Sequence, residues 1–177
     1  LKDVNKAVPA YFQKLDSVVL MIGERKNELG GSVYYSLFDE MGANVPKPNL
    51  EEVKNQIFAL TGCIDDGLVL SCHDISDGGV ASALSEMTFG NNIGCEIKID
   101  SSLSKEQLLF SETGGFVVEV STENIEEIKS VFSNYSLDVF KIGSTGGKII
   151  QMNDVIKISV NDIKEACADG LRETLWL

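Results

Sequence analysis

Residues 68–80 have the sequence Leu68-Val69-Leu70-Ser71-Cys72-His73-Asp74-Ile75-Ser76-Asp77-Gly78-Gly79-Val80. The apolar part, residues 68–72, has the length and composition of a buried β-strand. After a polar turn with two glycines, residues 80–89 carry apolar side chains on one face of a helix. A strand that leads through a tight turn into a helix is typical of a domain in which helices pack against a sheet.

On both sides of this unit, strand patterns and helix patterns alternate. Short apolar runs predict strands at residues 17–23, 95–99, 116–120, 139–142, 148–151 and 155–160. Helices are predicted at 32–41, between Ser32 as cap and Gly42 as stop, and at 50–60, 80–89, 125–132 and 161–175. The turn Ser144-Thr145-Gly146-Gly147 predicts a hairpin. Together these patterns predict an α+β fold, a mixed β-sheet packed with helices.

Length and composition indicate one folded unit. The chain has 177 residues, of which 44% are hydrophobic and 24% charged, which is ordinary for a globular protein. The sequence contains no repeat, low-complexity tract or Pro/Ser-rich linker, so residues 1–177 are expected to form a single domain. Because the first residue is Leu1 rather than Met, we expect this domain to be a fragment of a larger multidomain protein.

Charge and cysteine content argue against several classes of function. Asp and Glu total 27 against 15 Lys and Arg, a net charge of −12, so nucleic acid is not an expected partner. The longest apolar runs, residues 17–22 and 116–120, are too short to span a bilayer, and no signal segment opens the chain. The four cysteines lie far apart and there is one histidine. This argues against a zinc site and predicts reduced thiols in a cytoplasmic protein.

The turn after residue 72 offers two interpretations. Backbone N–H groups at a helix N-terminus attract anions, and paired glycines let a phosphate approach closely. Asp74 and Asp77 would then be candidate ligands for Mg²⁺, which prefers a few carboxylates together with waters and phosphate oxygens. Alternatively, Asp77 caps the helix and the glycines only make the turn. His73 is interpreted as a hydrogen-bonded structural residue rather than a catalyst.

Two further turns contain polar groups and glycines. Ser111-Glu112-Thr113 precedes the predicted strand at 116–120 and offers hydroxyls and a carboxylate to a phosphate or a metal, or is simply a solvated turn. Residues 28–32, Glu-Leu-Gly-Gly-Ser, indicate a turn followed by a Ser cap. The chain has no Walker A loop, GxGxxG motif or Ser-His-Asp arrangement. With a single histidine, self-contained acid–base catalysis is not expected, and no catalytic residue is assigned.

Taken in order, three segments resemble the phosphoribosylformylglycinamidine synthase family. They are residues 28–32 (ELGGS), 73–87 (HDISDGGVASALSEM) and 109–114 (LFSETG). The likeness is to the second carboxy-terminal-type domain of such synthases, of the kind shared with aminoimidazole ribonucleotide synthetase. It implies an ATP-dependent carbon–nitrogen ligase with glutamine as amide donor, which converts formylglycinamide ribonucleotide to its amidine in purine biosynthesis. The chain would then be the last of four domains and inactive by itself.

The resemblance also implies a site and its partners. It makes Asp74 the metal candidate, and it places Asp77, Gly78 and Gly79 at a phosphate-facing turn, with Ser111 and Glu112 across from them. ATP or ADP with Mg²⁺ would be shared with neighbouring domains, which hold the catalytic histidine. The expected partners are those domains, a glutaminase domain or subunit, and a small-molecule nucleotide substrate. The alternatives are a non-catalytic structural domain of the same enzyme and another ATP-dependent member of the superfamily, such as selenophosphate synthetase or thiamine monophosphate kinase.

Overall fold

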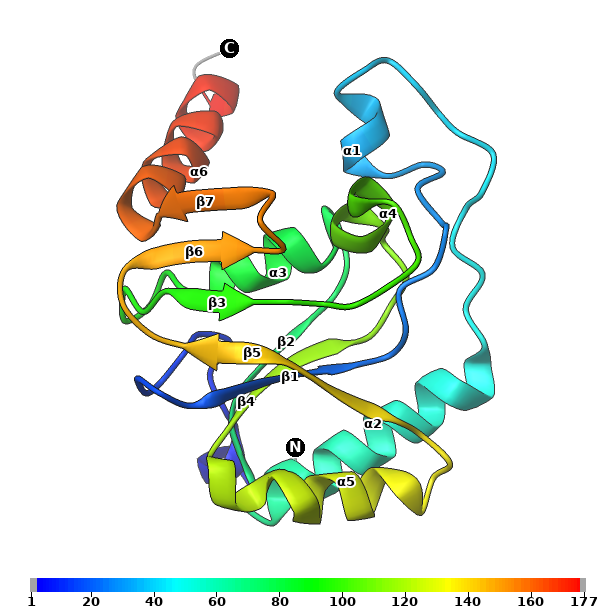
Figure 1. The fold of residues 1–177 in the computed structure, drawn as a ribbon, viewed down its shortest axis with the longest axis vertical. Coiled ribbons are helices and arrows are strands. Elements are labelled where there is room, and N and C mark those ends of the chain that lie inside the picture. Colours follow the sequence, from blue (N-terminus) through cyan, green and yellow to red (C-terminus); the bar gives the residue numbers. More distant parts are fainter. Residues whose placement is uncertain (1–2, 176–177) are drawn as a thin grey trace.

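The computed structural model describes residues 3–175, with the side chains of residues 3–170, and within them a seven-stranded sheet (Figure 1). The strands are β1 (Val18–Ile22), β2 (Val69–Asp74), β3 (Cys95–Ile97), β4 (Phe116–Val120), β5 (Val139–Thr145), β6 (Ile149–Met152) and β7 (Ile156–Ser159). Their order across the sheet is β2-β4-β1-β5-β3-β6-β7. Neighbouring strands are antiparallel except β3 and β6, which are parallel. The sheet is therefore mixed, and the predicted α+β class is confirmed.

Helices cover both faces of this sheet (Figure 1). Helices α2 (Leu50–Asp65) and α5 (Ile125–Ser133) lie on one face, and α3 (Gly79–Met87) and α4 (Lys105–Phe110) lie on the other. The short α1 (Val33–Ser36) lies beside α4, where the Tyr34 and Phe110 rings stack at 4.8 Å. Helix α6 (Val160–Leu175) follows β7, and two 3₁₀ turns, η1 (Val4–Lys6) and η2 (Thr122–Asn124), complete the described elements.

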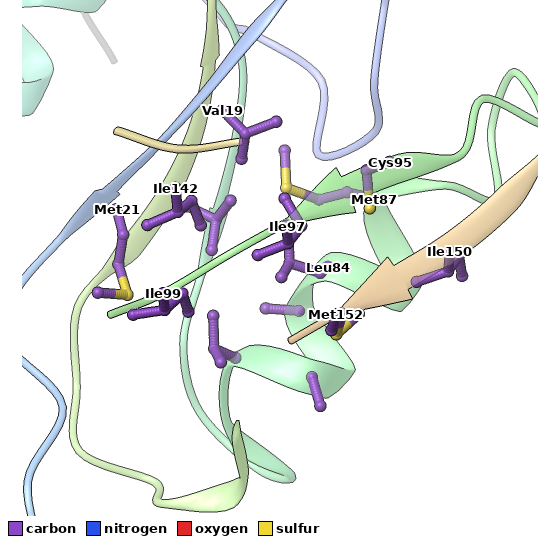
Figure 2. Close-up of a cluster of buried hydrophobic side chains, with 14 of the residues drawn as sticks. Val19, Met21, Leu84, Met87, Cys95, Ile97, Ile99, Ile142, Ile150 and Met152 are labelled. Carbon is purple, nitrogen blue, oxygen red and sulfur yellow. The ribbon is translucent and has the colours of Figure 1, made fainter. Parts of the chain in front are cut away.

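Strand β1 is buried on both faces in the middle of the sheet. Val19 and Met21 belong to the apolar core under α3 and α4, and Figure 2 shows both side chains in that cluster. Val18, Leu20 and Ile22 belong to the second core, under α2 and α5. Because successive side chains of a strand point to opposite faces, a strand covered on both sides is apolar at every position. This explains the uninterrupted apolar run that predicted the strand.

The hairpin predicted at residues 144–147 is wrong. β5 and β6 do not pair with each other, because β3 lies between them, antiparallel to β5 and parallel to β6. Gly94, just before β3, donates its N–H to the Gly147 carbonyl at 3.0 Å and accepts from the Gly146 N–H at 2.8 Å. The Gly-rich turn thus spans the end of a third strand. A turn sequence specifies the local bend but not whether the flanking strands become neighbours.

The helix predicted at residues 32–41 is much shorter than expected. Ser32 caps it as predicted and accepts from the Tyr35 N–H, but the α-helix ends at Ser36. Asp39 then adopts a positive φ of 56°. Leu37 and Phe38 are 74% and 61% exposed, so no packed apolar face supports further turns, and short helices need such packing to be stable.

One helix was not predicted from the sequence. Helix α4 begins with a capping box, in which the Ser104 side chain accepts from the Gln107 N–H and the Gln107 side chain accepts from the Ser104 N–H. Its six residues are too few for a clear helical period. The other predicted helices and strands are present with small shifts of their ends. Among the described residues, no helix has the length and apolar character needed to cross a membrane.

The different exposure of the four cysteines predicts their reactivity, since Cys63 and Cys95 are buried and Cys72 is partly buried. Burial raises the pKa of Cys63 to about 11 and, more strongly, the pKa values of Cys72 and Cys95 to about 12; nearby Asp66 and Asp74 add to the shifts at Cys63 and Cys72. Cys167 is exposed on α6. Because the thiolate is the reactive form, an aromatic disulfide reagent at pH 8 is expected to label one thiol per native chain rapidly. The other three should react only after unfolding in urea, and fast labelling of two or more native thiols would contradict this burial.

Candidate functional site

The polar turn between β2 and α3 is built on two glycines in left-handed conformations. Gly78 (φ 76°) is the N-cap residue of α3, and Gly79 (φ 67°) is its first residue. A side chain on Gly79 would have its Cβ 2.7 Å from the Leu109 carbonyl oxygen and 2.8 Å from Phe110 backbone atoms. The missing side chain of Gly79 therefore makes room for the end of α4, not for a phosphate.

The charged group at the start of α3 is the carboxylate of Glu112. Its Oε1 accepts the Gly78 N–H at 2.9 Å and the Val33 N–H at 2.8 Å. The N-termini of α3 and α1 thus share one carboxylate, which satisfies two donors that the helices leave unpaired and is favoured by both helix dipoles. The alternative prediction that Asp77 caps α3 is wrong, because α3 has no side-chain cap from its own N-cap region and Asp77 is exposed.

Arg25 holds the loop that carries Glu112. Its guanidinium donates to the carbonyl oxygens of Thr113 and Gly114, the latter at 2.7 Å. Thr113 in turn donates its hydroxyl to Glu28 Oε2 at 2.8 Å. Arg25 is only 8% exposed, and this burial lowers the pKa of its guanidinium to about 10, against an opposing effect of Glu28. The loop is therefore anchored from the end of β1 and from the ELGGS segment.

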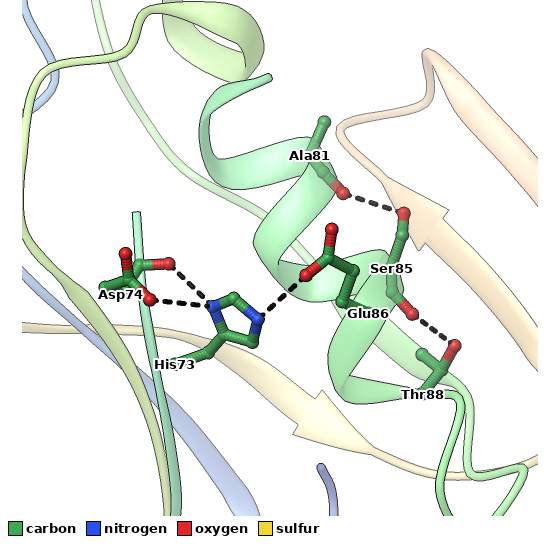
Figure 3. A network of polar contacts seen from close by, with 6 residues as sticks. All are labelled: His73, Asp74, Ala81, Ser85, Glu86 and Thr88. Atoms are coloured by element: carbon green, nitrogen blue, oxygen red, sulfur yellow. Dashed lines mark hydrogen bonds and ion pairs between the residues drawn. The ribbon is translucent and has the colours of Figure 1, made fainter. Parts of the chain in front are cut away.

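His73 lies at the end of β2, where it connects this strand to α3 (Figure 3). Its Nδ1 is 2.7 Å from the Asp74 carbonyl oxygen, and its Nε2 is 2.9 Å from Glu86 Oε2 on α3. Both ring nitrogens are therefore within hydrogen-bond distance of protein oxygen atoms. An imidazole engaged on both sides has no free nitrogen for a substrate proton. The geometry matches the structural interpretation of His73.

Asp74 and Asp77 present exposed carboxylates at this turn. The Asp74 side chain is 63% exposed, and its Oδ1 lies 3.5 Å from His73 Nδ1. No group of three or more His, Cys, Asp or Glu side chains within the described residues is arranged to hold a metal ion. Mg²⁺ is commonly bound through one or two carboxylates, with water and phosphate oxygens in its other positions. Asp74 suits that role as one ligand among several supplied from outside the chain.

Ser111 differs from these residues because it is fully buried. It ends α4, and its Oγ has no hydrogen-bond partner among the described residues. A bound molecule would reach this hydroxyl only if the end of α4 moved. The structure therefore brings Glu112 to the glycine turn, leaves Asp74 and Asp77 at the surface, and keeps Ser111 inside.

The sequence patterns do not identify Arg25 as part of the site. It lies three residues after the end of β1. A cation next to a buried strand is a usable signal, because charged side chains are rarely buried without partners. Its partners are carbonyl groups 88 and 89 residues further along the chain. No local pattern identifies them.

The Glu112 contacts lead to a stability prediction. Glu112→Ala is expected to lower the free energy of unfolding by about 1–3 kcal/mol, because two helix N–H donors lose their acceptor. Glu112→Gln should cost less, since the amide oxygen can accept both N–H groups. Urea unfolding followed by circular dichroism measures both, and an unchanged midpoint for Glu112→Ala would contradict the capping role.

Comparison with known proteins places the chain in one family. Residues 15–151 match the family described as AIR synthase related protein, C-terminal domain. Two relatives are phosphoribosylformylglycinamidine synthase PurL subunits. The one from Methanothrix thermoacetophila is 31% identical over 99% of this chain, and the one from Thermoanaerobacter sp. strain X514 is 35% identical over 85%. The chain covers 24% and 21% of their lengths, so it spans about a quarter of these relatives.

Solved structures show the same fold. PurL of Thermotoga maritima, in a structure of its complex with FGAR, superposes with a TM-score of 0.78 over 89% of this chain and 29% of that chain, at 18% identity. A thiamine-monophosphate kinase from Stenotrophomonas maltophilia superposes less closely, with a TM-score of 0.57 over 84% of this chain and 53% of that chain, at 10% identity. The family match covers most of the chain, so the protein belongs to the AIR synthase related family and has the fold of its C-terminal domain.

Proposed function

We propose that this chain is one domain of phosphoribosylformylglycinamidine synthase, the ATP-dependent ligase that converts formylglycinamide ribonucleotide to its amidine with glutamine as amide donor. The observation that carries the proposal is the 31% identity over 99% of the chain to a PurL subunit of that synthase. Residues 1–177 would be a single domain of it, in the cytoplasm, where the free buried thiols stay reduced.

An exposed apolar surface supports a position next to other domains. Val33, Leu37, Phe38 and Met41, in and after α1, are between 47% and 77% exposed. Large apolar side chains gathered on one surface mark an interaction site. We infer that a neighbouring domain of the synthase covers this surface. The glutaminase is a further proposed partner, in line with the structure of PurLQS from Thermotoga maritima.

We propose that the turn after β2 faces a nucleotide that is shared with a neighbouring domain. Structures of Thermotoga maritima PurL with ATP, ADP and AMPPCP support a nucleotide as the ligand class. Asp74 would contribute a carboxylate to Mg²⁺, and Asp77 lies exposed beside it. The inner side of the turn is already occupied by Glu112 and the end of α4. The residues there would therefore shape the turn on the side away from the nucleotide; they are Gly78, Gly79, Ser111 and Glu112.

The test is a calorimetric titration of MgADP into the purified 177-residue chain and its Asp74→Asn variant. Saturable binding that Asp74→Asn weakens at least about tenfold, with an unchanged melting temperature, is the expected result for a metal ligand. The isolated chain is expected to form no amidine from formylglycinamide ribonucleotide, ATP and ammonia. Amidine formation by the pure chain would contradict its proposed role as a partial domain.

A second candidate is a structural domain of the same synthase that binds no nucleotide. The occupation of the α3 N-terminus by Glu112 favours it, because the N–H of Gly78 is not free for a phosphate. In that case MgADP produces no heat of binding. The domain would then act through the apolar surface after α1, by packing against its neighbours. The double variant Leu37→Ser/Met41→Ser is expected to weaken assembly with the rest of the synthase.

A further inference from the structure

A cavity lies where the chain beyond β3 leaves β5. Lys98 still donates its N–H to the Ile142 carbonyl on β5, at 2.7 Å. The next residue, Ile99, exchanges two hydrogen bonds with the side chain of Asn153 instead, at 2.9 and 2.7 Å. Figure 1 shows the chain running from β3 toward α4 while β5 comes from α5. The opening between them has a volume of about 690 Å³, within the usual range for small-molecule sites.

One wall of this cavity is apolar. Met21, Ile99 and Ile142 lie behind it as core side chains, and Figure 2 shows these three at one end of the buried cluster. The apolar surface that faces the cavity comes from Phe140 and Leu103, which are only partly buried. A wall of this kind favours a flat or apolar part of a ligand, because burial removes apolar surface from water.

The cavity is also lined by cations. Arg25, Lys98, Lys129 and Lys141 line it together with two acidic residues, Glu24 and Asp100. The lining thus contains four of the 15 cationic residues of the chain but only two of its 27 acidic residues. In a chain with a net charge of −12, this local excess of positive charge stands out. It favours an anion in a hollow that is partly shielded from solvent.

Two of these cations are free to bind. Arg25 already donates to the Thr113 and Gly114 carbonyls, and Lys129 forms an ion pair with Glu126 at 2.9 Å. Lys98 and Lys141 have no ion-pair partner among the residues that the structure describes. In addition, the buried Nε of Arg25 has no hydrogen-bond partner within that part of the chain. A group that accepts several hydrogen bonds would suit the two lysine ammonium groups.

We propose that this cavity binds a small phosphate-bearing molecule with a ring, of the phosphomonoester class. The phosphate lies between Lys98 and Lys141, and the ring lies on the apolar wall of Phe140 and Leu103. Lysine ammonium groups bind phosphate through charge-assisted hydrogen bonds. None of the residues at the turn after β2 lines this cavity, so the proposal does not depend on the nucleotide site proposed for that turn.

The test is an NMR titration of the ¹⁵N-labelled 177-residue chain with AMP as the probe. Saturable shifts of the backbone amides of Lys98, Ile99, Lys141 and Ile142 are expected, and they should weaken as salt is raised. The double variant Lys98→Gln/Lys141→Gln should lose at least about tenfold in affinity. Lys148→Gln/Lys157→Gln removes the same charge outside the cavity and should bind like the parent chain. Arg25 is not replaced, because it holds the Glu112 loop.

Three outcomes would overturn the proposal. The first is that 10 mM-scale AMP leaves the cavity amides unshifted, or shifts only the amides of Gly78 and Gly79. The second is that the cavity variant and the control variant bind AMP equally. The third comes from two simpler probes. If adenosine binds as tightly as AMP, the phosphate does not contribute to binding. If inorganic phosphate binds as tightly as AMP, the apolar wall does not contribute.

Discussion

Glu119→Gln is expected to lower the free energy of unfolding by about 3–5 kcal/mol and the melting temperature by roughly 6–20 °C. Glu119 lies in the middle of β4 and is completely buried. Its Oε1 accepts the Lys14 N–H at 3.0 Å and the Ser17 hydroxyl at 2.6 Å. Its Oε2 accepts the Gln13 N–H at 2.7 Å and the Ser71 hydroxyl at 2.8 Å. Each carboxylate oxygen therefore meets one hydroxyl and one backbone N–H.

The large cost follows from the geometry of these donors. A glutamine amide accepts through one oxygen only, and its NH₂ group must take the place of the other. A hydroxyl can rotate to accept from this NH₂ group, but a backbone N–H cannot. Whichever way the amide is turned, the N–H of either Gln13 or Lys14 faces another donor without water to replace the lost bond. A buried polar group left unpaired in this way is costly.

Glu96→Gln is the matched control, because it makes the same chemical change on the exposed side of β3. Its unfolding midpoint in urea should be close to that of the parent chain. Ser71→Ala removes one hydroxyl donor and leaves both backbone N–H groups paired, so an intermediate loss is expected. If Glu119→Gln unfolds at the same urea concentration as Glu96→Gln, the four contacts do not stabilise the fold as argued.

The Glu119 contacts also show where prediction from the sequence stops. The apolar pattern of residues 116–120 predicts a strand, and period-two alternation places Glu119 on a buried face. The pattern contains nothing about the donors, which are 48 to 106 residues away along the chain. From the sequence alone, a carboxylate at a buried position contradicts the pattern of a buried strand. In the structure its four donors make it a link that holds residues 13–17 against β2 and β4.

The same limit separates the correct predictions from the wrong ones at the candidate site. Two adjacent glycines between a strand and a helix correctly predicted a tight turn, because the conformational need is local. The cap of α3 was assigned to Asp77 in one interpretation because that residue is near in sequence. The actual partner of Gly78 is Glu112, which is 34 residues away. Its position depends on the Arg25 contacts that hold its loop.

The hairpin error has a similar cause on the scale of the sheet. Residues 139–151 contain two apolar runs around a glycine turn, which is the usual pattern of paired strands. Which strand fills the gap between them depends on Ile97 and Cys95, which belong to the apolar core shown in Figure 2. The composition of a turn cannot show that another strand, more than 40 residues earlier, gains burial by entering between its arms.

Gly79→Ala is expected to lower the free energy of unfolding by about 2–5 kcal/mol. Part of this is the cost of a left-handed conformation for alanine, about 1–2 kcal/mol. The rest is overpacking of about 1–3 kcal/mol, because the new Cβ would lie 2.7–2.8 Å from backbone atoms of Leu109 and Phe110. Backbone atoms cannot rotate aside as a flexible side chain does, so the end of α4 must move.

Gly67→Ala separates the two contributions. Gly67 has nearly the same φ, 73° against 67°, and a Cβ at Gly67 would have no atom within 4 Å. It should therefore lose only the conformational part, and the difference between the two variants in urea unfolding measures the contact between α3 and α4. Moving α4 would also draw Glu112 away from its N–H donors, so the amide signal of Val33, which donates to Glu112 from α1, should shift in Gly79→Ala and stay unchanged in Gly67→Ala. Equal losses of stability in the two variants would show that α4 does not press against the glycine turn, and that the turn has room for a ligand.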